Sequence, residues 1–231
     1  MYEAAHAYPD GESTAARLAD TAARYGYDGL VVRARDATPD YEAIRAATPI
    51  DVVDAVEVVA DTPDRASGGI GNYRPKATLL LLQGGTNALN RFAVEQERVD
   101  VLTRPMAHDG DFNHVLARAA RENGVRVEFD LGPVLRLDGG HRVQAIRNLR
   151  KLRELVDHYD APYVVSGTPR SHLQLRASRE LVAVGETIGF SADQIREGLA
   201  EWGRLAERNR RLTSESFIAP GVEKASHEED D

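Results

Sequence analysis

The stretch Thr78-Leu79-Leu80-Leu81-Leu82-Gln83 (TLLLLQ) decides the fold class of this 231-residue chain. Four consecutive leucines leave no polar face in an extended or a helical backbone, so the segment has to be buried on all sides. Its length suits a short strand better than a buried helix. A strand that is apolar on both faces is typical of a parallel sheet covered by helices. The segment Gly29-Leu30-Val31-Val32-Arg33 has the same character.

Strands of this kind alternate with helical patterns along most of the chain. Strands are predicted at residues 2–7, 29–33, 52–60, 78–83, 100–103, 126–131 and 163–166. Helices are predicted at residues 13–26, 111–124, 141–159, 178–189 and 191–212, the second with Asp111 as its N-cap. Such a succession predicts a parallel sheet. Because the strands are short and no Gly-x-Gly-x-x-Gly follows the first, we expect an α/β fold of the TIM-barrel-like (β/α) type.

The pattern predicts one domain followed by a tail. No linker or change in composition interrupts residues 1–212, so we expect a single barrel domain there. The only long loop expected within it covers residues 61–76, which are rich in Gly, Pro and Arg. Residues 213–231 lose apolar periodicity and are expected to form an acidic, disordered tail. One buried stripe of the last helix is predicted to comprise Ile195, Leu199, Trp202 and Leu212.

Charge and composition limit the possible partners. The formal net charge is −8, but half of it comes from residues 221–231, which hold five acidic residues against one lysine. Only three of the 29 cationic residues are lysine, and arginine is the better bidentate partner for phosphate. GC-rich coding or a salty cytoplasm would give the same bias, and the sequence leaves these explanations open. Without cysteine, an apolar run of membrane length or a leader, we expect a cytoplasmic protein with no membrane contact.

Residues that could catalyse hydrolysis or bind a metal are scattered. The first strand offers His6 in His6-Ala7-Tyr8, without the second His that a metal-binding strand supplies two residues later. Glu128 and Asp130 alternate on one strand, where arginine can hold them by hydrogen bonds. The remaining candidates stand alone: Glu57, His108 and His158. We therefore expect no catalytic residue and no metal ligand in this chain.

Arginine, by contrast, recurs beside the predicted strand ends, where barrels place their binding sites. Two turns, Gly84-Gly85-Thr86 and Ser166-Gly167-Thr168, also offer backbone N–H groups that suit an anion. The predicted phosphate-binding residues are Arg33, Arg35, Arg74, Lys76, Arg104, Arg136, Ser166, Gly167, Arg170 and Arg176. A rim of this kind, with no general base or metal beside it, favours a binding protein over an enzyme.

The order of several short segments resembles that of a known family. The segments are 1–6 (MYEAAH), 22–30 (AARYGYDGL), 98–102 (RVDVL), 111–117 (DFNHVLA) and 163–167 (YVVSG), followed by Leu175-Arg176. Each is short, and their order and spacing over residues 1–212 carry the likeness. The sequence resembles archaeal ribonuclease P protein component 3, the counterpart of a subunit of eukaryotic ribonuclease P.

The resemblance implies a barrel related to the polymerase-and-histidinol-phosphatase fold, with its metal site lost. It also implies a non-catalytic subunit that helps the catalytic RNA to remove 5′ leaders from precursor tRNA. The implied partners are ribonuclease P RNA, protein component 2, components 1 and 4 of the same particle, and precursor tRNA. The chain then binds no cofactor itself, and the holoenzyme takes Mg²⁺ through its RNA. Two alternatives stay open on the same barrel: a metal-dependent phosphoesterase, and a sugar-phosphate enzyme with Ser166-Gly167-Thr168 as its phosphate cup.

Overall fold

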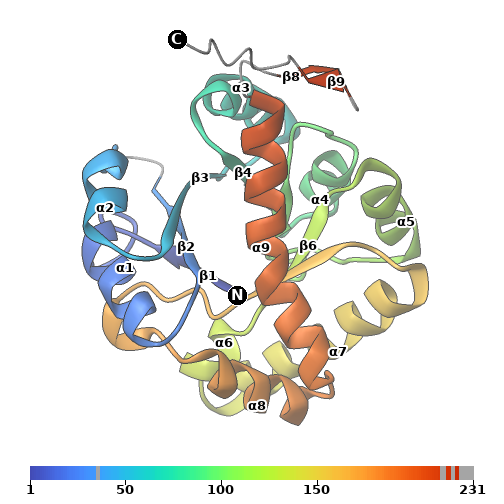
Figure 1. Ribbon diagram of the computed structural model, residues 1–231. Helices are drawn as coiled ribbons and strands as arrows, with labels where there is room; N and C mark the ends of the chain where they lie inside the picture. The colour runs from blue at the N-terminus through green and yellow to red at the C-terminus, as the bar shows by residue number, and fades with distance from the viewer. Residues whose placement is uncertain (35–36, 214–216, 220–221, 224–231) are drawn as a thin grey trace, which may run out of the picture.

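In the computed structural model, parallel strands form a nearly closed ring with helices around it (Figure 1). Residues 1–34, 37–213, 217–219 and 222–223 are described by this structure. The ring consists of β1 (Tyr2–His6), β2 (Gly29–Arg33), β3 (Asp51–Val58), β4 (Leu79–Gln83), β5 (Val101–Thr103), β6 (Arg126–Asp130) and β7 (Tyr163–Ser166). Each strand pairs in parallel with the next in chain order. The predicted barrel is confirmed.

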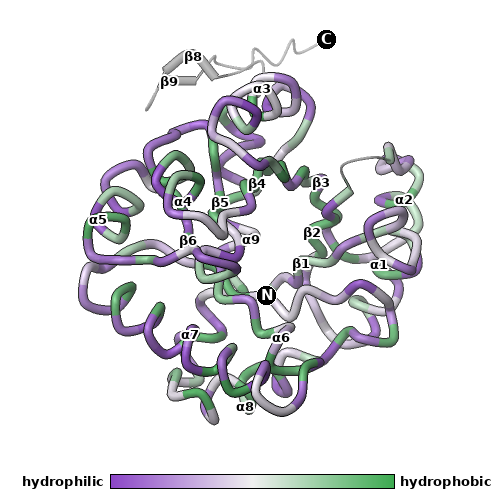
Figure 2. Tube along the Cα trace, turned by 180° about the vertical axis from the view of Figure 1, so that it is seen from behind, coloured by the Kyte–Doolittle hydropathy of each residue, from purple (hydrophilic) through white to green (hydrophobic). Residues whose placement is uncertain are grey.

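Most helices lie around the outside of the ring, and the last one, α9, crosses one end (Figure 1; Figure 2). The helices are α1 (Ala15–Arg24), α2 (Tyr41–Ala47), α3 (Pro63–Tyr73), η1 (Arg74–Lys76), α4 (Asn87–Val94), α5 (His114–Asn123), α6 (Gly132–Arg136), α7 (Gly139–Tyr159), η2 (His172–Gln174), α8 (Ser178–Ile188) and α9 (Ala192–Thr213). A separate antiparallel pair follows, β8 (Phe217–Ala219) with β9 (Val222–Glu223). Most of the predicted tail lies outside the described residues, so its disorder stays a prediction.

The interior of the ring is apolar at the amino ends of the strands, and α9 plugs it there. Alternation along each strand points one set of side chains inward. This inner cluster joins Ala4, Val31, Val53, Leu81, Val101 and Val164 of the strands to Trp202 and Leu205 of α9. The indole of Trp202 is fully buried, and its Nε1 donates a hydrogen bond to the carbonyl oxygen of Val165 (2.9 Å). A helix thus replaces the deeper side-chain layers of a closed barrel.

The predicted stripe of α9 is only partly correct. Ile195, Leu199 and Trp202 are buried as expected. Leu212 is 41% exposed, because it lies in the last turn of α9, beyond the strands that cover the rest of the stripe.

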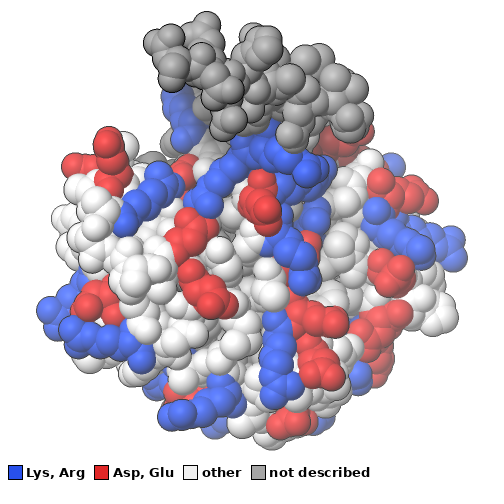
Figure 3. All heavy atoms as spheres, viewed as in Figure 1, with Lys and Arg blue, Asp and Glu red and all other residues white. Residues whose placement is uncertain are grey.

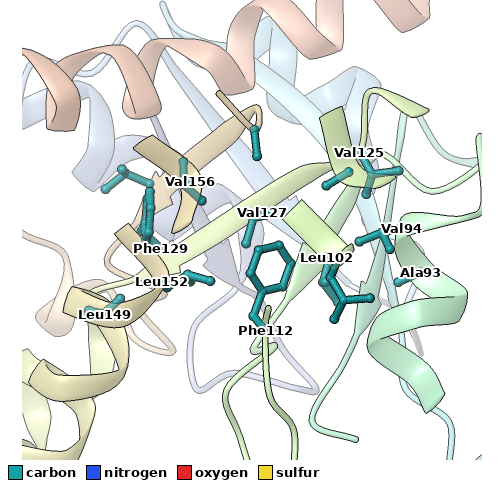
Figure 4. Packing of buried hydrophobic residues seen from close by; sticks show 14 of the residues in the cluster. Ala93, Val94, Leu102, Phe112, Val125, Val127, Phe129, Leu149, Leu152 and Val156 are labelled. Atoms are coloured by element: carbon teal, nitrogen blue, oxygen red, sulfur yellow. The ribbon is translucent and has the colours of Figure 1, made fainter. Parts of the chain in front are cut away.

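A second apolar cluster lies between the outer face of the ring and the surrounding helices. Figure 4 shows Phe112 beside Leu102 of β5 and Val127 of β6, and all three are fully buried. Phe129 packs edge-to-face against Phe190, with ring centroids 4.8 Å apart. The outward faces of the strands are apolar because they pack against the helices, and the inward faces are apolar because they pack against α9. This explains why the strand sequences are apolar at consecutive positions.

Strands β1 and β7 lie side by side without a backbone ladder in the described pairings. The side-chain carboxyl group of Glu3 bridges the two strands instead, since its oxygens accept hydrogen bonds from the backbone N–H of Gly167 (2.9 Å) and of Ala4 (2.8 Å). Helix α9 packs on both strands from the inside. Burial raises the pKa of Glu3 to about 8. The ring is therefore closed by the side chain of Glu3, by α9 and by a backbone hydrogen bond from the N–H of His6 to the carbonyl oxygen of Pro169 (2.9 Å).

The predicted loop at residues 61–76 is wrong, because α3 and η1 occupy it. Thr62 begins α3 by accepting a hydrogen bond from the backbone N–H of Arg65 (3.4 Å), and Pro63 fits the first turn. Glycines at positions 68, 69 and 71 weaken the helical signal of the sequence. One of them, Gly69, lets α3 lie close to β3: a Cβ there would be 2.8 Å from Cγ1 of Val58.

The predicted N-cap of the next long helix is also wrong. Asn113 caps α5, and its side-chain oxygen accepts from the N–H groups of Val115 (3.0 Å) and Leu116 (3.3 Å). Asp111 instead contacts Nζ of Lys151 (2.5 Å). Both residues are good caps, and only the position of the turn decides between them.

Candidate functional site

A polar layer fills the carboxyl end of the barrel interior. The inward positions lower in the barrel are mostly apolar, but the last inward position of each strand is polar. In chain order, these positions are His6, Arg33, Glu57, Gln83, Thr103, Asp130 and Ser166, and Glu128 lies one inward position below Asp130 on β6. Barrel enzymes hold their catalytic groups at this end of the strands, so the contacts of this layer decide what the site can do.

Arg33 lies at the centre of the layer and is 1% exposed. Its Nη1 lies 3.4 Å from Oε2 of Glu128, and its Nη2 donates to Oε1 of the same carboxylate. Nη1 is also 3.7 Å from Oε1 of Glu57, and the guanidinium carbon lies 5.5 Å from the ring centroid of Trp202. Burial alone would lower the pKa of Arg33, but the charges of Glu128 and Glu57 raise it. Arg33 is therefore a permanent cation inside the barrel.

Ser166, Thr103 and His6 lie against the two carboxylates that flank Arg33. Ser166 donates to Glu128 (2.5 Å), and Thr103 donates to Glu57 (2.5 Å). Nδ1 of His6 lies 3.9 Å from Oε2 of Glu57. Burial and the positive charge of Arg33 lower the pKa of His6 to about 3, so its imidazole is neutral at physiological pH.

This arrangement does not fit a catalytic metal. A divalent cation between Glu57 and Glu128 would need the space that the guanidinium of Arg33 fills. In residues 1–34, 37–213, 217–219 and 222–223, no three His, Cys, Asp or Glu side chains are grouped to hold a metal ion. The two carboxylates already have a cation of their own, so a second one gains little from them.

The two predicted anion-binding turns bond within the chain instead. The N–H of Gly167 donates to Glu3, and the hydroxyl of Thr168 donates to Asp130 (2.6 Å). In the other turn, the N–H of Gly84 donates to the carbonyl oxygen of Thr103 (2.8 Å) and that of Gly85 to Oδ1 of Asn90 (3.1 Å). A phosphate would have to displace these partners. The geometry therefore disfavours Ser166-Gly167-Thr168 as the phosphate cup of a sugar-phosphate enzyme.

Beside the polar layer, a cleft of about 930 Å³ opens between the loop after β5 and helices α6 and α7. Met106, Ala145, Leu149 and Leu152 give it an apolar wall. Arginines also line it: Arg104, Arg136 and Arg170. The cleft is thus a cationic site with an apolar wall, next to a barrel mouth whose charges are already paired.

The three cleft arginines have no carboxylate partner within the described part of the chain. Arg136 donates to the carbonyl oxygens of Gly167 (2.8 Å) and Thr168 (3.0 Å), and burial lowers its pKa. Arg170 donates to the carbonyl oxygen of Asp10. The side chain of Arg104 makes no hydrogen bond or ion pair there.

Of the predicted phosphate-binding residues, the cleft brings together only Arg104, Arg136 and Arg170. Arg33 is buried in the barrel and paired with Glu128; it lines a small neighbouring pocket of about 90 Å³, which Arg104 and Arg170 also line, and it does not line the cleft. The guanidinium of Arg176 donates to the carbonyl oxygens of Leu173 (3.2 Å) and Leu175 (2.9 Å), away from the cleft.

The expectation of one rim is wrong for Arg74 and Lys76. Both precede β4 instead of following a strand, so they lie at the amino end of the barrel. There Nη1 of Arg74 is 2.5 Å from Oδ2 of Asp100, and Nζ of Lys76 is 2.8 Å from Oδ1 of Asn72. Arg35 lies outside the described residues. RNA binding by any of these residues stays a prediction.

Sequence reasoning missed the apolar wall of the cleft. Helix α7 buries Leu149, Leu152 and Val156 in its second half, and its first half, residues 139–148, has no buried residue. The sequence carries a weak signal of this in the poorly amphipathic stretch GGHRVQAIRN. A helix that leaves the barrel for half of its length can form the side of a cleft.

The fold and the site together define a class: a parallel (β/α) barrel in which an arginine and its carboxylates fill the mouth. A histidinol phosphatase structure from Listeria monocytogenes, described as putative, shares this fold, with a TM-score of 0.51 and 8% identity over 78% of this chain and 99% of that one. The chain belongs to the RNase P subunit p30 family, whose sequence pattern matches residues 1–214. The resemblance found in the sequence is confirmed.

Relatives match over nearly the whole chain. Ribonuclease P protein component 3 of Halorubrum lacusprofundi is 58% identical over the full length of both proteins, and that of Haloarcula marismortui is 60% identical over 96% of each. A chain in the cryo-EM structure of archaeal ribonuclease P with mature tRNA superposes with a TM-score of 0.85 and 21% identity, covering all of both chains.

Proposed function

We propose that this chain is a non-catalytic protein subunit of ribonuclease P and helps the catalytic RNA to remove 5′ leaders from precursor tRNA. Membership of the RNase P subunit p30 family and relatives named ribonuclease P protein component 3 support this function. The observation that carries it is the position of Arg33, which pairs with Glu57 and Glu128 where a barrel hydrolase holds its catalytic groups. Both carboxylates that flank Arg33 are engaged, since Glu128 also accepts from Ser166 and Glu57 accepts from Thr103.

In this function the chain acts in the cytoplasm, within a particle and away from membranes. None of the described helices has the length and apolar character needed to cross a membrane. Its partners are ribonuclease P RNA, precursor tRNA, protein component 2, and components 1 and 4. It binds no cofactor of its own, and Mg²⁺ enters the reaction through the RNA.

The contribution of the protein is electrostatic. A folded RNA and a bound precursor tRNA bring many phosphates together, and their repulsion has to be screened by cations. Arg104, Arg136 and Arg170 line one cleft and form no ion pair with a carboxylate of the described chain, so they can screen phosphates where Mg²⁺ is scarce. Each phosphate contact releases counterions, so a few contacts change affinity by orders of magnitude as salt changes.

Reconstitution across a magnesium titration tests this function. The catalytic RNA is assayed for precursor tRNA cleavage with component 2, with and without this chain. We expect the chain to raise activity most at low Mg²⁺, and the double variant Arg104→Asn with Arg170→Ala to lose most of this benefit. Arg147→Ala, which removes an exposed charge of α7 that does not line the cleft, is the matched control. Cleavage by the protein without RNA, or an equal benefit at every Mg²⁺ concentration, would contradict the proposal.

A further inference from the structure

We propose that the cleft between the loop after β5 and helices α6 and α7 binds an unpaired nucleotide of RNA. Its phosphate lies against Arg104 and Arg170, and its base lies against the apolar wall formed by Met106, Ala145 and Leu149. This inference rests on the proposed function, since it names the kind of RNA element that the chain recognises within the particle. In Figure 2, α6 and α7 lie beside the mouth of the barrel, on the side away from α9.

The charges of the cleft favour an anionic ligand. Arg104, Arg136 and Arg170 line one cleft, and three like charges raise the energy of the free protein unless an anion joins them. Two carboxylates also line it. Glu128 pairs with Arg33, while Asp130 accepts from Thr168 (2.6 Å) and from the N–H of Gly132 (2.8 Å) and attracts Arg104 and Arg136 without forming an ion pair with either. One such carboxylate against three arginines leaves the cleft with an excess of positive charge. Guanidinium groups suit phosphate because each can donate two parallel hydrogen bonds.

The backbone around the cleft is held in an uncommon conformation. Arg104 (φ 48°), His108 (φ 48°) and Thr168 (φ 43°) adopt the left-handed region, and all three line the cleft. Non-glycine residues with positive φ cost free energy and cluster at sites where their position serves a ligand. At Arg104 this conformation fixes the direction in which an otherwise unpartnered guanidinium leaves the backbone.

The apolar wall favours an unpaired nucleotide over a duplex. A duplex presents phosphates and ribose at its surface and keeps its bases stacked inside. It therefore exposes no base face that could pack against an apolar wall. An unpaired nucleotide exposes the face of its base, and that face is buried favourably against apolar side chains. Clefts that enclose small ligands have volumes of roughly 300–1,000 Å³, and the 930 Å³ here is enough for at least one nucleotide.

Fluorescence anisotropy of the full chain with a short oligouridylate and a matched RNA duplex tests the cleft directly. We expect the single strand to bind more tightly. Arg104→Asn keeps a residue that tolerates positive φ, so it should fold normally. It should weaken single-strand binding about tenfold, as the loss of one charge-assisted contact does. The slope of log affinity against log salt should fall by about 0.7, the value for one phosphate contact.

Two further variants separate the cleft from a general charge effect. Ala145→Trp fills the cleft without changing charge, and should weaken single-strand binding at least as much as Arg104→Asn. Arg147→Ala removes a positive charge from the same helix outside the cleft, and should leave the affinity within about twofold. Thermal melting of each variant shows whether the fold is intact.

Three results would overturn the inference: preference for the duplex, affinity unchanged by both Arg104→Asn and Ala145→Trp, or binding of component 2 lost in these variants while RNA affinity is kept. The last result would make the cleft a protein-docking surface. The proposed function has a separate test, because a chain that stimulates the catalytic RNA equally well with the cleft filled keeps its function and loses only the nucleotide site.

Discussion

The two ends of the barrel differ in what their arginines contact. At the amino end, Arg210 of α9 holds both oxygens of Asp51 (2.9 and 3.0 Å), and Arg74 pairs with Asp100. Figure 3 shows this face, where blue and red side chains alternate around α9. At the carboxyl end, Arg104 and Arg170 face a cleft without a carboxylate partner in the described chain.

The difference shows that one residue type serves two purposes in this protein. Arg210 fastens α9 to Asp51, Arg74 fastens η1 to Asp100, and both arginines belong to the fold. The unpaired ones add little to the folded state and leave their charge available to a ligand. Composition does not separate these groups, and strand position does so only in part, since Arg33 ends β2 at the carboxyl end and is paired; the carboxylate beside each arginine separates them. If this comparison is correct, mutations at the two ends should affect different measurements.

The largest effect should come from the plug at the amino end. Trp202→Ala leaves a cavity where α9 fills the ring, and should lower the free energy of unfolding by roughly 3–5 kcal/mol. Leu212→Ala on the same helix should cost less than about 0.5 kcal/mol, because that side chain is 41% exposed. Urea titrations followed by circular dichroism measure both. Equal losses of stability in the two variants would mean that the burial of Trp202 does not hold α9 in the ring.

Next in size should be the loss of Arg33, a predicted phosphate-binding arginine that is buried in the barrel. Arg33→Met leaves Glu57 and Glu128 buried without their cation, and should destabilise the protein by about 3 kcal/mol at neutral pH. A stable variant with weakened RNA binding would instead place Arg33 at the RNA.

A smaller effect should appear as pH dependence at the carboxyl end. The groups that face His6 are Arg33, Arg170, Glu128, Arg104 and Glu57. Since the pKa of His6 is lowered to about 3 in the folded chain, its imidazole takes up a proton below pH 6.5 in the unfolded chain but stays neutral in the folded chain. Stability is therefore lost as pH falls through this window. When the pH is lowered from 7 to 5.5, the free energy of unfolding of the wild-type protein should fall by about 1 kcal/mol more than that of the His6→Asn variant.

The pKa of Glu3, raised to about 8, makes the free energy of unfolding rise as pH falls, which is the opposite direction. This contribution is the same in the wild-type protein and in His6→Asn. The difference in stability between the two proteins therefore reports on His6 alone. Urea titrations of the two proteins at pH 7, 6 and 5.5 provide the measurement. Parallel stability curves over this range would show that His6 takes up a proton in the folded state.

The smallest difference tests the comparison most directly. Arg210→Ala breaks a partly exposed bidentate pair and should cost between roughly 0.5 and 1 kcal/mol. Arg104→Asn removes no internal partner and should change stability by less than about 0.5 kcal/mol. In RNA binding the order should reverse, with Arg104→Asn the weaker binder. If the two variants lose stability equally, the distinction between paired and unpaired arginines fails.

Much of the fold could be predicted because its signals are local. The strand at Leu79–Gln83 is apolar throughout, and β6 and β7 begin at the residues where their patterns begin. Helix α3 escaped prediction because its three glycines hide its helical propensity, and only contact with Val58 explains one of them. The local sequence pattern of α3 does not show that the helix packs against a neighbouring strand.

The site could be predicted less well, because it depends on which end of the barrel each arginine reaches and on what it meets there. The position of Arg104 after β5 correctly placed it at the carboxyl end. The same reasoning failed for Arg74, which precedes its strand, and it could not reveal that Arg33 would turn inward to Glu128. Such pairings join residues that are far apart in the chain, so the pattern of a single segment cannot predict them.

The seam between β1 and β7 has a consequence for the timing of synthesis. The backbone N–H of Gly167 and the carboxylate that it meets on Glu3 are 164 residues apart in the chain. At roughly 5–20 residues per second, a ribosome needs on the order of 10–30 seconds to make that span. Helix α9, which packs on the same seam, emerges later still. During this interval β1 has a neighbour on one side only, and an unpaired strand edge is where chains associate wrongly. The barrel is begun by its first strand and cannot be finished until nearly all of the chain has been made.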